Sequence, residues 1–343
     1  MSNEEQGCAL VDQDRTDKRP KALALLSGGL DSLLAVKMVL DQGIEVEAVN
    51  FVTPFCLCDR CSVSHFGAKL GIKIHRVFLG QEFLDMVASP TYGYGSQMNP
   101  CLDCRILMFK KAKGLAERIG ADFLVTGEVL GERPFSQRKE SMLKIEREAG
   151  VEGKVLRPLS AMLLSESEPE RRRLVRRDML LGVRGRRRAP QMELARKLGI
   201  AEYPNPSGGC LLTDPRFADR LREHLKHEDT LTLKDVALLK CGRHFRIDGV
   251  KVIVGRNEQE NNRLLMIAEK SGIPYLKTVD HEGPLTLITG KDSQNVLKKA
   301  AAITARYSDA PKDAPARVAF KDKEEQILEI EAIKDEELEP LRV

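Results

Sequence analysis

Short apolar runs alternate with helically spaced apolar positions in the first part of the chain. Four runs have the length of buried strands: residues 21–26, 44–51, 72–78 and 122–126. The apolar spacing at residues 31–42 and 105–119 predicts helices between strands. Strands that alternate with helices predict an α/β fold with a doubly wound parallel sheet. A ligand of such a sheet binds at the C-terminal ends of the strands, which places the turn after the first strand in the site.

The pattern changes after about residue 231. Two apolar runs, residues 245–247 and 250–254, flank Asp248-Gly249, a pair that favours a two-residue hairpin turn. The periodicity then predicts a helix, two strands and a second helix: residues 262–270, 274–278, 285–288 and 292–307. This order predicts a separate and smaller C-terminal α+β domain.

Composition narrows the class of protein. A chain of 343 residues with 42% hydrophobic and 31% charged residues can form two or three globular domains. It contains no apolar run of eighteen residues and no apolar stretch near its start, so we expect a cytoplasmic protein without a membrane span or signal peptide. Most of the eight cysteines fall in tight clusters, which in a reducing compartment favours metal binding or catalysis over structural disulfides.

The segment Ser27-Gly28-Gly29-Leu30-Asp31-Ser32 lies between the first predicted strand and the first predicted helix. Its glycines let the backbone curl around an anion, and the amide groups of a helix N-terminus point toward that anion. Ser27 and Ser32 add hydroxyl donors. Asp31 would repel the anion unless a magnesium ion lies between them. The Walker pattern of kinases and GTPases is absent, so a different class of phosphate loop is expected.

This segment resembles the pyrophosphate loop of the PP-loop ATPases, which cut ATP between the α and β phosphates and pass AMP to an oxygen atom. Thr126-Gly127-Glu128-Val129-Leu130-Gly131 and Ser136-Gln137 resemble the T-G-E-x-x-G-Q…S-Q stretch of tRNA 4-thiouridine synthetases, with Glu132 in place of the Gln. Arg157-Pro158-Leu159 resembles the R-P-L that follows it. The resemblance spans residues 20–215 and extends, at a greater distance, to the 2-thiouridine synthetases. The chain after about residue 240 resembles the RNA-binding part of the NFACT proteins.

The resemblance implies a PP-loop sheet of the HUP class, like the adenine nucleotide alpha hydrolases, with ATP as cofactor and its adenine near residues 49–51. The residues that it places at the nucleotide are Ser27, Gly28, Gly29, Asp31, Ser32, Phe51 and Gly127. It also implies catalytic roles for Asp31, with magnesium, and for Glu128 at the end of the fourth strand.

Three cysteines are arranged as a pair and a distant third. Cys101 and Cys104 form a C-x-x-C pair at the start of a predicted helix, and Cys210 lies in Ser207-Gly208-Gly209-Cys210-Leu211-Leu212-Thr213. This arrangement resembles the tRNA thiolation enzymes in which three thiolates hold a [4Fe-4S] cluster, whose fourth iron has no protein ligand and can bind hydrosulfide. Two alternatives stay open: a persulfide on Cys101 or Cys104 that Cys210 resolves, and a structural zinc site with one further ligand.

A second group of potential ligands follows the second strand. Cys56, Cys58, Cys61 and His65 offer four nitrogen and sulfur donors, which would suit a tetrahedral zinc ion. Their spacing is unusually tight, and a structural role for the thiols is an equal alternative.

Arginines are concentrated in one short segment, although the formal net charge of the chain is only +4. We expect this segment to contact the phosphate backbone of tRNA. Its candidate residues are Arg172, Arg173, Arg176, Arg177, Arg184, Arg186, Arg187 and Arg188. The polar residues His244, Arg246, Arg256 and Asn257 of the C-terminal domain are expected to add to this contact.

Together these features predict an ATP-dependent tRNA sulfurtransferase that adenylates a uridine carbonyl and replaces its oxygen with sulfur from hydrosulfide or a persulfide-carrying protein. Two other hypotheses are a PP-loop ligase or amidotransferase that adenylates a small carboxylate, and a non-catalytic RNA-binding protein. The expected division is a disordered tail (1–19), an ATP-binding domain (20–165), a basic tRNA-contacting segment with the third cysteine (166–230) and an RNA-binding-like domain (231–343).

Overall fold

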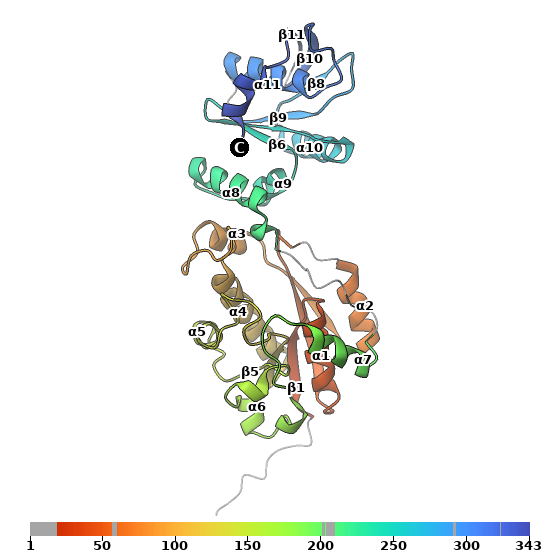
Figure 1. The fold of residues 1–343 in the computed structure, drawn as a ribbon, viewed down its shortest axis with the longest axis vertical. Helices are drawn as coiled ribbons and strands as arrows, with labels where there is room; N and C mark the ends of the chain where they lie inside the picture. Colours follow the sequence, from red (N-terminus) through yellow and green to blue (C-terminus); the bar gives the residue numbers. More distant parts are fainter. Residues whose placement is uncertain (1–18, 57–59, 201–202, 204–209, 291–292, 323) are drawn as a thin grey trace, which may run out of the picture. The chain divides into compact units, whose positions relative to one another are not determined.

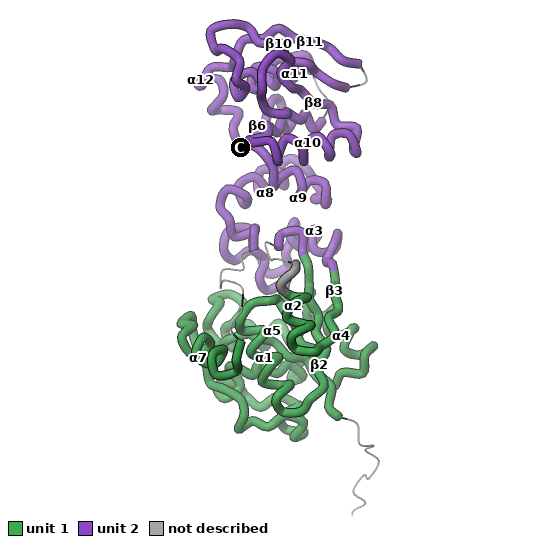
Figure 2. Tube along the Cα trace, turned by 90° about the vertical axis from the view of Figure 1, so that its right-hand side faces the viewer, with its two compact units in different colours: residues 1–52, 58–77, 105–208 green, residues 53–57, 78–104, 209–343 purple. Residues whose placement is uncertain are grey.

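The computed structural model describes residues 19–56, 60–200, 203, 210–290, 293–322 and 324–343. The expected tail at residues 1–18 and the loop at residues 204–209 therefore lie outside the described residues. The chain folds into two compact units whose segments interleave in the sequence (Figure 2). Unit 1 takes residues 1–52, 58–77 and 105–208, and unit 2 takes residues 53–57, 78–104 and 209–343.

A five-stranded sheet forms the centre of unit 1, with the strand order β3-β2-β1-β4-β5 (Figure 1). Its strands are β1 (Lys21–Leu25), β2 (Glu45–Val52), β3 (Ile74–Phe78), β4 (Phe123–Thr126) and β5 (Val155–Leu156). β1 pairs in parallel with β2 on one side and with β4 on the other, and β4 pairs in parallel with β5. The prediction of a parallel α/β sheet is confirmed, and the chain changes direction across the sheet between β1 and β4.

Helices surround this sheet. They are α1 (Leu30–Leu40), α2 (Arg60–Leu70), α4 (Cys101–Ile119), α5 (Lys139–Ala149), α6 (Glu168–Arg171) and α7 (Ala189–Lys197), with 3-10 turns at Ala161–Leu163 and Arg177–Met179. The predicted helices over 31–42 and 105–119 are present, and α4 begins at Cys101, where the C-x-x-C pair was expected to start a helix.

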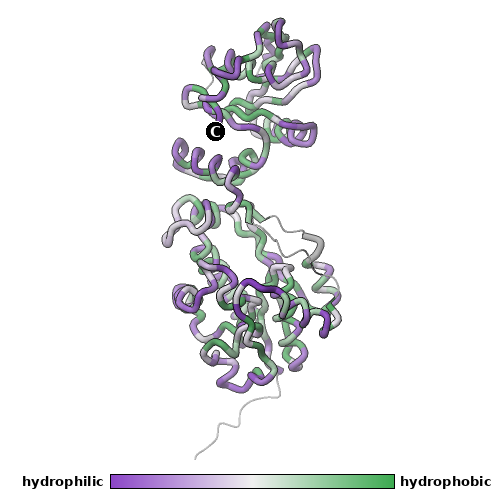
Figure 3. The backbone as a smooth tube through the Cα atoms, in the orientation of Figure 1, coloured by the Kyte–Doolittle hydropathy of each residue, from purple (hydrophilic) through white to green (hydrophobic). Residues whose placement is uncertain are grey.

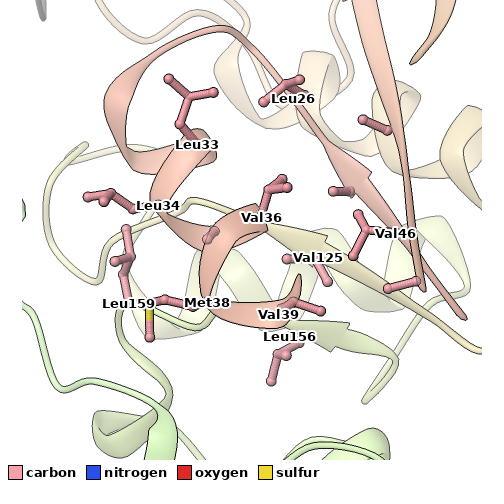
Figure 4. Packing of buried hydrophobic residues seen from close by; sticks show 14 of the residues in the cluster. Leu26, Leu33, Leu34, Val36, Met38, Val39, Val46, Val125, Leu156 and Leu159 are labelled. Atoms are coloured by element: carbon pink, nitrogen blue, oxygen red, sulfur yellow. The ribbon is translucent and has the colours of Figure 1, made fainter. Parts of the chain in front are cut away.

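Aliphatic side chains form the core of unit 1, in agreement with the low aromatic content. Figure 4 shows Val36 and Val39 of α1 on the side of the helix nearest Val125 of β4 and Val46 of β2, within one cluster of buried residues. Burial of each such side chain contributes about 1.5–3 kcal/mol relative to exposure. α1 is therefore anchored along its length, which fixes the position of the turn from which it starts.

Unit 2 contains a six-stranded antiparallel sheet with the order β11-β10-β8-β9-β7-β6. Its strands are β6 (Arg243–Ile247), β7 (Val250–Val254), β8 (Tyr275–Thr278), β9 (Thr286–Thr289), β10 (Ala316–Lys321) and β11 (Glu325–Ile330). Asp248 and Gly249 both have positive φ, 47° and 82°, as the predicted hairpin turn requires. Hydrophobic residues follow the strands of both sheets in Figure 3.

Alternate residues of this sheet face two different helices. Val252 and Val254 join the core under α11 (Gln294–Arg306), whereas Ile253 joins the core under α10 (Glu258–Ser271). The other helical elements of unit 2 are α3 (Gln81–Ala88), α8 (Pro215–His227), α9 (Leu233–Leu239), α12 (Asp335–Leu338) and the 3-10 turns Leu211–Thr213 and Glu339–Leu341. The predicted α+β character is confirmed. Among the helices of the described residues, none is long and apolar enough to cross a membrane.

Candidate functional site

The turn after β1 has the backbone geometry of an anion site. Gly28 adopts a φ of 85°, in the left-handed region that favours glycine, and Gly29 precedes the first turn of α1 in an extended conformation. Ser27 Oγ accepts a hydrogen bond from the amide of Gly29 (3.3 Å), and Ser32 Oγ donates to the carbonyl of Gly29 (2.8 Å). The two hydroxyls thus hold the turn, and the amides at the start of α1 are available to a negatively charged ligand.

The end of β4 lies directly against this turn. A Cβ atom on Gly127 would lie 2.4 Å from the carbonyl carbon of Asp31 and 2.4 Å from the amide nitrogen of Ser32. On the other side of β1, the Asn50 side chain donates to the carbonyl of Leu26 (2.8 Å), and Phe51 beside it is half-buried. The structure therefore brings together the turn, Gly127 and the predicted adenine segment at the point where the strand order reverses.

We predict that Gly127→Ala displaces the turn, because the new methyl group would meet backbone atoms rather than a flexible side chain. Overpacking of this kind costs about 1–3 kcal/mol of unfolding free energy. ATP affinity, measured by equilibrium dialysis, should fall by about tenfold or more, since the amides would no longer converge on the phosphate. Gly114→Ala in α4 is the matched control, because a Cβ there meets no atom within 4 Å. Equal ATP affinity of both variants would contradict the prediction.

Glu128 is buried and held by two arginines of unit 1. Arg105 Nε donates to Glu128 Oε1 (2.9 Å), and Arg157 Nε donates to Glu128 Oε2 (3.0 Å). Arg157 also pairs with Glu146. Burial alone would raise the pKa of Glu128, but the two guanidinium groups lower it below its ordinary value. Both oxygens are engaged, so Glu128 fixes the end of β4; its participation in the chemistry stays a prediction.

Glu128→Gln should destabilise the protein by about 3–5 kcal/mol, because it leaves buried guanidinium charge without its carboxylate. Since folding lowers the pKa of Glu128, its stabilising contribution is present above the ordinary carboxyl pKa and is lost as the pH falls through the folded pKa. The unfolding free energies of wild type and variant, measured by urea denaturation, should therefore become more similar as the pH is lowered. Exposed Glu148→Gln on α5 should stay within about 0.5 kcal/mol of wild type. A difference in unfolding free energy between wild type and Glu128→Gln that does not change with pH would contradict the role of the Glu128 carboxylate in stability.

Asp31 lies in the first turn of α1 and shares a guanidinium group with Glu132. Arg188 Nη2 is 3.6 Å from Asp31 Oδ2 and 3.2 Å from Glu132 Oε1. Burial raises the pKa of Asp31 despite the lowering effect of Arg188, and it raises the pKa of Glu132, to which repulsion from Asp31 adds. Arg188 is thus the counter-charge that the two carboxylates share.

No function was expected for Glu132 or Gln191, and Arg188 was expected to contact tRNA. A parallel β-bridge joins Leu130 to Arg184, so the arginine segment lies beside the residues that follow β4. The next helix, α7, packs against α1. These contacts place Arg188 beside the turn after β1.

The cysteines of the predicted cluster all belong to unit 2. Cys101 and Cys104 occupy the first turn of α4, and both are half-buried, as is Cys210. The amide of Met98 donates to the carbonyl of Leu212 (3.1 Å), which ties the approach to α4 to the segment after Cys210. Asp103 accepts from the amides of Thr91 (2.9 Å) and Tyr92 (3.1 Å) and so fixes the preceding loop.

Cys56 lies beside Cys210. The two residues form an antiparallel bridge, and the amide of Leu211 donates to the carbonyl of Phe55 (3.1 Å). The Phe55 ring packs against Phe83 and Phe217, with centroids 6.1 and 5.8 Å away, which holds this segment in place. The second predicted metal site is not described, because Cys58 and the side chain of Cys61 lie outside the described residues. Among the side chains that are described, no three His, Cys, Asp or Glu residues converge to hold one metal ion.

The predicted RNA-contacting arginines fall into two groups. Arg172, Arg173, Arg176, Arg184, Arg186 and Arg187 are exposed. Arg177, in contrast, donates to the carbonyls of Ala161 (2.9 Å) and Leu164 (3.0 Å) and pairs with Glu170. Arg177 therefore stabilises its own segment.

Four further residues expected at tRNA have internal contacts in unit 2. His244 is buried and its Nε2 lies 2.8 Å from the carbonyl oxygen of Cys241. Arg246 pairs with Glu223, and Arg256 pairs with Glu260. Asn257 caps α10 by accepting from the amide of Glu260 (3.0 Å). These contacts give all four residues a structural role.

Two family models match separate stretches of the chain. Residues 18–166 match the family model of the thiamine biosynthesis protein ThiI, and residues 242–342 match that of the NFACT protein RNA binding domain. The two matches cover separate stretches of the chain, of which the first is similar to ThiI and the second to the NFACT RNA binding domain. The predicted resemblance to both families is confirmed.

Curated relatives include two kinds of tRNA-thiolating protein. The chain is 34% identical over 126 residues to the tRNA-specific 2-thiouridylase MnmA of Syntrophotalea carbinolica, covering 32% of this chain and 35% of the relative. It is 34% identical over 151 residues to the probable tRNA sulfurtransferase of Thermoanaerobacter sp. strain X514, covering 41% and 37%. The chain thus spans about a third of the length of these relatives.

Among solved structures, the chain is similar to the U34-tRNA thiolase NcsA from Methanococcus maripaludis with its [4Fe-4S] cluster. The TM-score is 0.31 at 19% identity, over 61% of this chain and 66% of that one.

Proposed function

We propose that this protein is an ATP-dependent tRNA sulfurtransferase, which adenylates a uridine carbonyl and replaces its oxygen with sulfur. The observation that carries the proposal is the turn at Ser27–Ser32, built as an anion site at the reversal of the strand order and packed against Gly127. The ThiI-type and NFACT-type family matches support ATP and RNA as its ligands. The thiolating relatives support a uridine in tRNA as the group that is modified.

In the proposed reaction, the amides at the start of α1 and the hydroxyls of Ser27 and Ser32 bind the phosphates of ATP. The adenine lies along residues 49–51. A uridine carbonyl oxygen attacks the α phosphorus, and pyrophosphate leaves with the electrons of the broken bond. Adenylation turns a poor leaving group into AMP. Hydrosulfide then attacks the activated carbon, AMP departs, and one proton is released as thiouridine forms. The fixed amides stabilise the charge that develops on the α phosphate.

Cys101, Cys104 and Cys210 are the residues that would hold a [4Fe-4S] cluster. Their donor set is entirely thiolate, which such a cluster requires, and contacts within unit 2 tie their segments together. When bound, the cluster would supply an iron with no protein ligand that can carry sulfur. Asp103 between the cysteines fixes the loop at Thr91 and Tyr92.

The adenylation step predicts that the protein catalyses pyrophosphate exchange into ATP only when unmodified tRNA is present. Ser32→Ala, which removes a hydroxyl donor from the turn, should lower the exchange rate by about a hundredfold. Mass spectrometry of nucleosides from the reacted tRNA should show a gain of sulfur in place of oxygen. Exchange that needs a small carboxylate instead of tRNA would assign the protein to the ligases. Binding of tRNA without any ATP turnover would make it a non-catalytic RNA-binding protein.

Protein purified without oxygen should contain about four irons and four acid-labile sulfides per chain. Cys210→Ala should lose them, together with the visible absorption of the cluster. Cys241→Ala is the matched control, because Cys241 is buried beside Arg263 in the core under α10 and belongs to neither cysteine group. Intact protein without iron or sulfide would reject the cluster and direct attention to the persulfide route.

A further inference from the structure

Two cysteines of unit 2, Cys56 and Cys210, lie directly opposite each other in an antiparallel bridge. Opposed residues of antiparallel strands either exchange backbone hydrogen bonds with each other or are flanked by such bonds. The amide of Leu211 donates to the carbonyl of Phe55 (3.1 Å), so this bond joins the residue after one cysteine to the residue before the other. The two cysteines are therefore a flanked pair, the kind in which opposed side chains lie closest together.

The backbone groups of both cysteines bond to other residues, in agreement with a flanked pair. The amide of Cys56 donates to the carbonyl of Thr53 (3.2 Å). The carbonyl of Cys210 accepts from the amide (2.9 Å) and from the hydroxyl (2.7 Å) of Thr213. These bonds use the groups that Cys56 and Cys210 would exchange in a pair of the other kind.

The spacing of a flanked pair matches that of a disulfide. Its Cα atoms are about 4.5 Å apart, and its side chains point to the same face. Disulfides join residues whose Cα atoms are about 4.4–6.8 Å apart. The segment is held in this register by the packing of the Phe55 ring and by Lys240, which donates to the carbonyl of Pro54. Cys101 and Cys104 belong instead to the first turn of α4.

We propose that Cys56 and Cys210 are a redox modification site: in protein without the cluster they form a disulfide, which removes Cys210 from the cysteines that would hold iron. The disulfide itself follows from the register of the bridge. Its effect on iron rests on the proposed function, because a [4Fe-4S] cluster takes thiolate ligands and a sulfur atom in a disulfide is not a thiolate. Cys56 thereby controls the cluster without being one of its ligands.

Thiol–disulfide exchange forms the bond, with a low-molecular-weight disulfide such as glutathione disulfide as the oxidant. The thiolate of one cysteine attacks a sulfur atom of the oxidant, and the other half of the oxidant leaves as a thiolate. The second cysteine then attacks the protein sulfur of this mixed disulfide, and the remaining glutathione leaves. Two protein thiols are thus oxidised while one disulfide is reduced to two thiols, and the protons of the two cysteines pass to the two glutathione thiolates.

The disulfide is tested on full-length protein from which iron has been removed by a chelator and in which all cysteines have been reduced. After incubation with glutathione disulfide, the remaining thiols are alkylated and the protein is digested with trypsin without reduction. Mass spectrometry should find residues 38–60, which contain Cys56, joined to residues 198–216, which contain Cys210. Reduction should separate them. Residues 198–216 joined instead to residues 77–105, which contain Cys101 and Cys104, or not joined at all, would overturn the proposal.

Two matched variants identify the cysteine, because residues 38–60 also contain Cys58. Cys56→Ser should abolish the joined peptides, whereas Cys58→Ser should keep them. Joined peptides that persist in Cys56→Ser and disappear in Cys58→Ser would assign the disulfide to the wrong residue for the bridge and so reject the pair.

The effect on iron is measured by the visible absorption of cluster-containing protein in anaerobic buffers of increasing glutathione disulfide to glutathione ratio. Wild type should lose the absorption at a ratio about tenfold lower than Cys56→Ser, because an opposed thiol displaces glutathione from Cys210 within one molecule. Equal ratios for the two proteins would contradict the effect on the cluster. Joined peptides in a wild type that never holds iron would reject the proposed cluster and leave the disulfide site in place.

Discussion

The close approach of two backbones at Gly127 is the constraint on which the nucleotide site depends. The turn after β1 and the turn after β4 leave adjacent parallel strands, and nothing larger than hydrogen fits between Gly127 and the Asp31–Ser32 peptide. The core under α1 fixes one side of this contact, and the ion pairs of Glu128 fix the other. The amides of this turn, which are proposed to bind phosphate, are thus held in place by packing and buried charge.

The cysteine segments depend on a different constraint. Segments from three separate parts of the chain meet in unit 2: the stretch around Phe55, the approach to α4, and the residues from Cys210 onward. The aromatic contacts of Phe55 and the backbone bridge between Cys56 and Cys210 hold them together. Cys210 is therefore placed in the same unit as Cys101 and Cys104, although it is distant from them in the sequence.

Local patterns predicted the fold well. The parallel sheet, the phosphate turn, the Asp248-Gly249 hairpin and the helical start at Cys101 follow from rules that act over a few residues, and all are present. Contacts between residues that are distant in the sequence could not be predicted from local patterns. Neither the placement of Cys56 beside Cys210 nor that of Arg188 beside Asp31 has a periodic signal, because each depends on how distant segments pack. Charge alone also gave no sign of the internal partners of His244 and Arg246, which are the carbonyl of Cys241 and the carboxylate of Glu223. The roles of the cysteines and the domain boundaries stay predictions.

The ion-pair chain from Arg105 through Glu128 and Arg157 to Glu146 has equal numbers of positive and negative groups. Loss of any one member leaves a net charge in a space that water reaches poorly, whereas loss of an adjacent opposite pair restores neutrality. Substitutions that remove charge at these four positions are therefore expected in pairs, with one acidic and one basic residue replaced together. Related proteins should carry either the full set or a version shortened by one acidic and one basic residue, so that the four positions vary together as one inherited unit.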